Sequence, residues 1–226
     1  MTGSDWIVVG TCLFLGSCAL LAPYLSEVLK RRFISPKLRV EFENRTPYCH
    51  RTKWRVTDPN GLVVGEPPVY YFRFSVQNHG KARAQSCEAI LEEVWKADSA
   101  GNYYHDDTFA PTSLKWEGNV QFIDINPGRR MFVDIGHISH PDHQSRHEKS
   151  SSVLIDPSDG RLRFILDLKS YYFFQIDSLF PGKHRLKVGI VGENFPRLDK
   201  WFELTWSGNW KVEEKDMLRE AVFTVR

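Results

Sequence analysis

The stretch that decides the fold is "VYYFRFSVQ", residues 69–77, in which large apolar side chains stand at every second position. One alternate set consists of Tyr70, Phe72, Phe74 and Val76. The other set, at positions 71, 73, 75 and 77, reads Tyr, Arg, Ser and Gln. Successive side chains of a strand point to opposite faces of its sheet. The pattern therefore predicts a half-buried strand whose first set lies in a core.

The same alternation recurs in the C-terminal two thirds of the chain. It is clear in residues 161–168, 184–191 and 201–206, and shorter in 119–125, 129–136 and 221–226. In "RLRFILDL", residues 161–168, we expect the Leu and Phe side chains to point inward, and Arg161, Arg163 and Asp167 to point outward. Turn sequences rich in Pro, Gly and Asn separate the runs, at residues 58–61, 78–80, 126–128, 158–160 and 181–182.

These runs define the expected fold class. The best helix candidate is the short segment of residues 210–220. Many short alternating strands with so little helix predict a mainly β protein, an immunoglobulin-like antiparallel β-sandwich over residues 36–226. Long loops at 98–118 and 137–157 account for a domain larger than a minimal seven-stranded sandwich.

A different element precedes this domain. Residues 6–25, "WIVVGTCLFLGSCALLAPYL", contain no charged side chain. A helix of twenty residues is about 30 Å long, which matches the hydrocarbon thickness of a bilayer. We therefore expect residues 6–25 to be a transmembrane helix in contact with membrane lipid, and residues 1–35 to form an anchor with a basic juxtamembrane segment.

The flanking charges predict the orientation of this span. Lys30, Arg31, Arg32, Lys37 and Arg39 follow it, and no Lys or Arg precedes it. Cytoplasmic flanks carry an excess of Lys and Arg. The sequence thus predicts a single-pass protein of the cell membrane with its C-terminal domain in the cytoplasm.

One alternative places the domain in the periplasm. Leu15 to Cys18, "LGSC", loosely matches a lipobox, although the apolar run continues beyond the cysteine. A periplasmic lipoprotein-like domain would be acylated at Cys18 and would join Cys49 to Cys87 in a disulfide. Residues 44–46, Asn-Arg-Thr, also match the glycosylation tripeptide, which would matter only for an outward-facing domain in a eukaryotic cell.

Several short motifs resemble those of a known group of domains. They are Asn78-His79-Gly80, Ala84 with Cys87, "DINPG" at 124–128, "VDIG" at 133–136 and "PGKHRLKVGIVGEN" at 181–194. Together they resemble bacterial and archaeal immunoglobulin-like domains. "SPKLRVEF", residues 35–42, directly behind an apolar run, is similar to uncharacterised prokaryotic single-span membrane proteins that carry such a sandwich. The resemblance implies a fold and an anchored architecture, and no specific function.

Histidines suggest a metal site. His137, His140, His143 and His147 lie within eleven residues, and neutral imidazoles bind zinc, copper or nickel. Their spacing matches no known ligand template, and Pro141 interrupts any helix. A metal- or ligand-binding domain, with hydrolytic activity built on this loop, is therefore an alternative hypothesis.

The net charge and the absence of known catalytic motifs narrow the set of possible functions. The net charge of +2 drops to +1 without the first 35 residues, so the domain lacks the basic footprint of a nucleic-acid-binding protein. No nucleophile elbow, P-loop, zinc-protease motif or dinucleotide fingerprint is present. We therefore expect no enzyme and no cofactor, but an interaction module that binds a protein partner at the cytoplasmic face.

Overall fold

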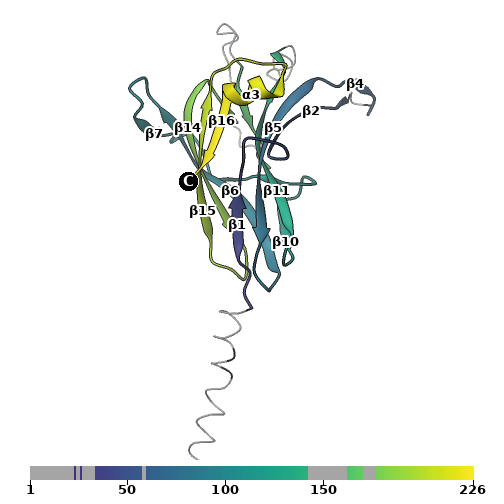
Figure 1. The fold of residues 1–226 in the computed structure, drawn as a ribbon, viewed down its shortest axis with the longest axis vertical. Helices are drawn as coiled ribbons and strands as arrows, with labels where there is room; N and C mark the ends of the chain where they lie inside the picture. Colours follow the sequence, from purple (N-terminus) through teal and green to yellow (C-terminus); the bar gives the residue numbers. More distant parts are fainter. Residues whose placement is uncertain (1–22, 24–25, 27–33, 58–59, 142–161, 170–176) are drawn as a thin grey trace, which may run out of the picture.

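The computed structural model describes residues 23, 26, 34–57, 60–141, 162–169 and 177–226 (Figure 1). Within these residues the chain is mainly β, with two antiparallel seven-stranded sheets packed face to face and one short helix. This confirms the predicted β-sandwich. Among the described residues, no helix is long and apolar enough to cross a bilayer. The span predicted for residues 6–25 lies, apart from Pro23, outside the described residues.

The first sheet is built on two long central strands, β5 (Pro68–Asn78) and β11 (Arg130–Ser139), which pair along their length. On the side of β5 that faces away from β11, β1 (Leu38–Glu41) and β2 (Cys49–Lys53) each pair with part of its length. On the other side of β11 lie β9 (Lys115–Trp116) and β12 (Phe164–Leu166), and β13 (Ser178–Leu179) follows β12.

The second sheet has the order β10-β6-β14-β15-β16. Its long members are β6 (Ala84–Ala97), β14 (Gly182–Val191), β15 (Leu198–Trp206) and β16 (Ala221–Val225). Three short strands share the free edge of β6, namely β7 (Tyr103–His105), β8 (Thr112–Ser113) and β10 (Ile123–Ile125). A separate two-stranded ribbon, β3 (Val56–Thr57) with β4 (Val63–Gly65), projects from the upper end of the domain in Figure 1.

The core lies between the sheets and consists of the side chains that the alternation predicts. All four apolar positions of residues 70–76 are at most 1% exposed. Aromatic rings join the two layers: Phe74 meets Phe202 at 5.0 Å between ring centroids, and Phe72 meets Phe223 at 5.1 Å. Burying a Phe side chain stabilises a fold by roughly 1.5–3 kcal/mol. These cross-layer contacts therefore hold the sheets together.

Two predicted details are wrong. Arg163 and Asp167, expected to face solvent, are only 5% and 4% exposed. The outer face of the first sheet is covered at this point, because Phe180 lies over the Arg163 guanidinium at 4.1 Å and Asp167 pairs with the buried His137. The helix predicted over residues 210–220 is shorter, since α3 spans Glu214–Glu220 only.

Both described cysteines are free thiols, so the Cys49–Cys87 disulfide of the periplasmic hypothesis is contradicted. Cys49 lies in the first sheet and Cys87 in the second, each 0% exposed. Burial raises the pKa of Cys49 to about 12 and that of Cys87 to about 11. Cys87 is a small buried core residue, as its strand-like surroundings predict.

The outer edge of β16 is closed by a side chain. Asn44 donates its amide N–H to the backbone oxygen of Phe223 at 2.7 Å, and the Phe223 N–H donates to the Asn44 carbonyl oxygen at 3.2 Å. The amide thus makes the pair of hydrogen bonds that a neighbouring strand would otherwise supply. The nitrogen and the oxygen of the Asn44 side-chain amide, in the Asn-Arg-Thr tripeptide, are therefore both hydrogen-bonded within the fold.

Candidate functional site

The lower end of the domain in Figure 1 is organised around one buried side chain, Asn78, at the end of β5. Its amide donates to the backbone oxygens of Ala82 (2.7 Å) and Ile125 (2.9 Å). Its carbonyl oxygen accepts from the N–H groups of Gly80 (2.9 Å) and Lys37 (3.2 Å). Asn78 is fully buried, and all these groups need partners. One side chain therefore joins β1, β10 and the turn that follows β5.

Gly80 allows the chain that enters β1 to pass against this turn. A Cβ atom at Gly80 would lie 2.2 Å from the Ser35 oxygen and 2.4 Å from the Lys37 nitrogen, so only glycine fits. Two backbone bonds complete the contact, from His79 N–H to Lys37 oxygen (2.8 Å) and from Lys81 N–H to Ser35 oxygen (3.2 Å). The segment 35–37 is thus clamped to the turn at residues 78–81.

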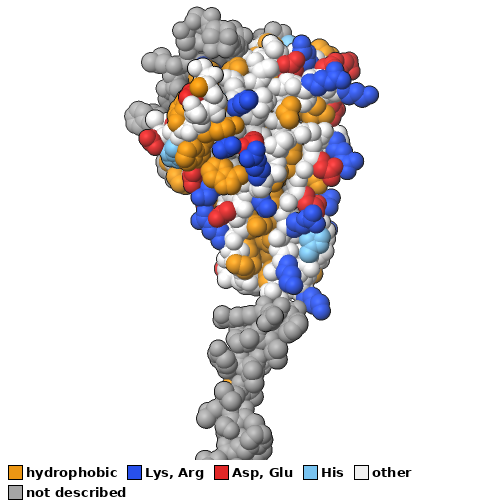
Figure 2. Space-filling model, turned by 60° about the vertical axis from the view of Figure 1, so that its left-hand side comes forward, with side chains coloured by type: hydrophobic (Ala, Val, Ile, Leu, Met, Phe, Trp, Pro, Cys, Tyr) orange, Lys and Arg blue, Asp and Glu red, His pale blue; other side chains and the backbone are white. Residues whose placement is uncertain are grey.

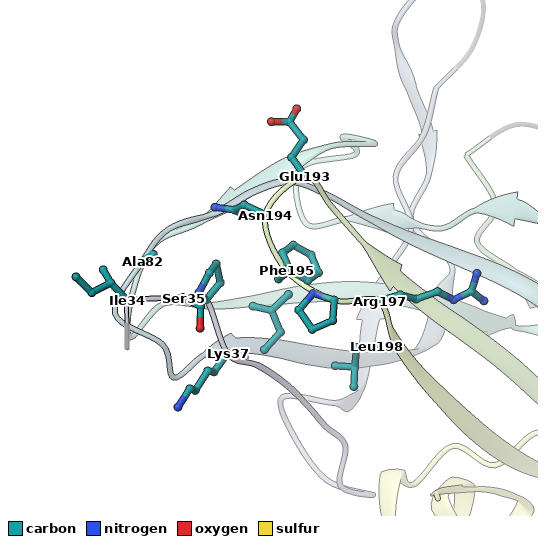
Figure 3. A pocket seen from close by; sticks show the side chains of 12 residues that line it. Ile34, Ser35, Lys37, Ala82, Glu193, Asn194, Phe195, Arg197 and Leu198 are labelled. Atoms are coloured by element: carbon teal, nitrogen blue, oxygen red, sulfur yellow. The ribbon is translucent and has the colours of Figure 1, made fainter. Parts of the chain in front are cut away.

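A groove of about 1090 Å³ opens beside this clamp (Figure 3), and we call it the lower groove. One wall is residues 34–38, and the other is residues 193–198, which connect β14 to β15. In Figure 3, Phe195 occupies the centre, whereas Lys37, Glu193 and Arg197 point away from it. The lower groove therefore has an apolar interior and a charged rim.

The loop that forms the second wall is held in place by β6. Asn194 accepts a hydrogen bond from the Gln85 N–H (3.0 Å) and donates one to the Arg83 oxygen (2.9 Å). Gly192 lies so close to the Phe195 ring that a Cβ atom there would stand 2.3 Å from a ring carbon. The Phe195 ring is consequently fixed beside the groove by the backbone that precedes it.

Three exposed cations surround this end, and we call Lys37, Lys81 and Arg129 the basic collar. Asn78 holds the three segments that carry these cations. Its side chain bonds residues 37, 80 and 82, as described above. Its backbone N–H donates to the Arg129 backbone oxygen (3.0 Å), and its backbone oxygen accepts from the Gly128 N–H (2.7 Å). None of the three forms an ion pair with a residue in the described part of the chain. Figure 2 shows Lys and Arg side chains around this lower end.

The acidic groups nearby already have partners. Asp124 pairs with Arg83, and the Glu193 carboxylate accepts a hydrogen bond from the Ser86 hydroxyl at 2.7 Å. Arg197, on the rim, pairs with Glu92 and Asp199. Of these acidic groups only Glu193 has no cation beside it in the described chain, since its partner is a neutral hydroxyl. The three cations of the basic collar therefore leave a net positive charge at this end.

A second polar cluster lies on the outer face of the first sheet. His137 Nδ1 lies 3.1 Å from an Asp167 oxygen, and Lys115 Nζ lies 3.9 Å from the other. Beside them Arg73 Nε stands 3.5 Å from Asp134. Burial raises the pKa of Asp134 to about 6, although the Arg73 charge acts in the opposite direction. Trp54 covers the His137 ring at 4.9 Å between centroids. His137 and Asp167 are buried, whereas Lys115, Arg73 and Asp134 remain partly exposed at the edge of the cluster.

The structure describes only two of the four predicted metal ligands. His137 is engaged with Asp167, and His140 packs against Trp210 with 5.4 Å between ring centroids. His143 and His147 lie outside the described residues. In the ranges that are described, no three His, Cys, Asp or Glu side chains gather as metal ligands. A metal site at His137, His140, His143 and His147 stays a prediction.

Sequence reasoning missed the lower groove, because its two walls are separated by more than 150 residues. The available signals were Asn78-His79-Gly80 and the loop "GENFPR", residues 192–197. The groove lining holds no His, Cys or Asp among the residues the structure describes there. The apolar interior and charged rim suit binding of an amphiphilic group.

No protein-family model matches the chain, and neither a curated protein nor a solved structure is similar to it at a significant level.

Proposed function

We propose that the chain is a single-pass membrane protein with an immunoglobulin-like β-sandwich at the cytoplasmic face, and that the domain binds a protein partner without catalysing a reaction. The uncharged run at residues 6–25, the basic residues that follow it and the resemblance to prokaryotic anchored sandwiches support the anchor. The two-sheet fold with a clamped first strand supports a rigid module directly behind that anchor.

The observation that carries the binding role is the apolar tip of the β3–β4 ribbon. Leu62, Val63 and Val64 are consecutive, and they are 67%, 50% and 63% exposed. Contiguous exposed apolar side chains mark interaction sites on soluble surfaces. The ribbon forms its own two-stranded sheet, so its tip is available without disturbing the core.

The position of the ribbon suits a partner that approaches from the aqueous side. In Figure 1 it projects from the end of the domain opposite to the start of β1. Residues 6–25, if they span the bilayer, would therefore lie at the far end from the ribbon. Burying a fully exposed Val or Leu side chain contributes roughly 1.5–3 kcal/mol. The exposed fractions of these three side chains therefore supply about 3–5 kcal/mol before the cost of association.

Photo-crosslinking in native membranes tests the binding role. A photoreactive residue replaces Val63 in the full chain, and a matched control replaces Val222, which is 36% exposed on the edge strand β16. We expect one discrete protein adduct at position 63 and none at 222. Leu62→Asp with Val64→Asp should remove the adduct and leave the urea unfolding midpoint unchanged. No adduct at position 63, or the same adducts at both positions, would contradict the binding role.

Two further measurements test the anchor. The chain should remain in the membrane pellet at alkaline pH, and protease added to intact cells should leave the domain uncut. Release at alkaline pH would contradict the anchor, and cleavage in intact cells would contradict the cytoplasmic orientation.

A further inference from the structure

We infer that the lower groove and the basic collar form a binding surface for anionic phospholipid of the membrane that holds the chain. This inference rests on the anchor proposed above, and it adds a lipid site formed by the folded domain itself.

The chain between the predicted span and the groove is short. Only eight residues, 26–33, separate Leu25 from Ile34. Eight residues reach about 12 Å as a helix and at most roughly 28 Å fully extended. The clamp at residues 35–37 adds no slack, since these residues are hydrogen-bonded to the turn at 78–81. The lower end of the domain is therefore confined to the neighbourhood of the lipid headgroups.

The charge of the basic collar is complementary to an anionic lipid surface. Lys37, Lys81 and Arg129 are exposed and without acidic partners in the described chain, and they come from three separate turns or strand ends. A Lys or Arg near an anionic leaflet contributes about 1 kcal/mol, so the collar supplies about 3 kcal/mol. Lys30, Arg31 and Arg32 precede the same end in the sequence and add to the attraction.

The chemistry of the lower groove matches that of a phospholipid. Its interior is provided by Pro36, Phe195 and Leu198, and its rim by charged groups, with Lys37 the cation that lacks a partner. A phospholipid has the matching sequence of groups, because its phosphate is anionic and its glycerol and acyl carbons are apolar. We assign the phosphate to Lys37 and the first acyl carbons to Phe195.

The test uses the full chain reconstituted in vesicles, with fluorescence quenched by lipids that carry a nitroxide near the glycerol. A fluorophore is attached at Pro196→Cys beside the groove, or at Val64→Cys on the ribbon as a matched control, with the N-terminal cysteines Cys12 and Cys18 replaced by serine. The two remaining thiols are buried and do not react with the dye.

We expect strong quenching at position 196 in vesicles with anionic lipid, weak quenching there in purely zwitterionic vesicles, and little at position 64 in either. Lys37→Glu with Lys81→Glu should weaken occupancy by anionic lipid about tenfold or more, because two favourable contacts become repulsive. The control pair, Lys215→Glu with Arg219→Glu, lies in α3 and changes the net charge by the same amount as the collar pair. It should leave the quenching unaltered.

Each outcome bears on one proposal. Consider first protein that is retained in the vesicles at alkaline pH. Equal quenching at positions 196 and 64, or quenching at 196 that survives reversal of the collar charges, would then overturn the lipid site. Protein that leaves the vesicles at alkaline pH would overturn the anchor instead. Binding of that released protein to added anionic vesicles, with quenching at 196, would support the lipid site alone.

Discussion

Replacing Asn78 by alanine is the sharpest test of how the lower end is held together. The substitution removes four hydrogen bonds at once, to Ala82, Ile125, Gly80 and Lys37. The bond to the Ile125 oxygen is buried, and a buried acceptor left without a partner costs about 1–3 kcal/mol. The other three are partly buried, where water can replace the amide, and each contributes about 0.5–1.5 kcal/mol. Together these contributions span about 2.5–7.5 kcal/mol, so we expect Asn78→Ala to lower the free energy of unfolding by at least about 2.5 kcal/mol.

Urea unfolding of the full chain in detergent, followed by tryptophan fluorescence, measures this loss. His79→Ala is the matched control, because His79 is exposed and its backbone bond to Lys37 survives the change. The control should stay within about 0.5 kcal/mol of the wild type. Asn78→Asp keeps the acceptor for Gly80 and Lys37 but loses both donated bonds, so its effect should be large as well. A loss for Asn78→Ala no greater than that for His79→Ala would refute the argument that this side chain joins the surrounding turns.

Three other predictions follow from the same structure. Gly80→Ala should lower the free energy of unfolding by about 2–3 kcal/mol, measured in urea, because its Cβ would lie 2.2 Å from the Ser35 oxygen. Burial raises the pKa of Asp134 from 3.8 to about 6, so the fold favours its protonated form. Relative to Asp134→Asn, the wild type should lose about 2.4 kcal/mol of unfolding free energy as the pH rises from 4 to 7, and a pH-independent difference would contradict this. Cys49 and Cys87 should not react with a thiol reagent at pH 8 until the chain is unfolded, when both should react, in a variant whose two N-terminal cysteines are serine.

The sequence pattern predicts some strands well and hides others. Residues 69–77 and 184–191 alternate without interruption, and both form long strands with the expected faces buried. The longest strand, β6, does not show this pattern, because its buried residues are spaced by three, two, two and three positions. Ser86, at φ 49°, accounts for the first irregularity, and a register shift opposite Lys187 and Val188 accounts for the second. A period of two cannot survive two bulges within fourteen residues.

The sites were harder to predict than the strands for a similar reason. Alternation assigns each side chain to a face, but it does not say whether the outer face is covered. Asp167 was expected in solvent, whereas the structure buries it against His137, whose ring packs on Trp54. The metal site predicted at His137 stays a prediction. The lower groove was invisible for a different reason, since residues 34–38 and 193–198 meet only in three dimensions.

The amide of Asn44 has a consequence for how copies of this chain behave at high concentration. An open strand at the rim of a sheet can recruit the same strand of another molecule, and repetition of that step yields fibrils. At Phe223 the two groups that would begin such growth are already taken by Asn44. Two copies of this chain that meet at this edge therefore cannot extend each other's sheet at Phe223, because one carboxamide occupies both groups.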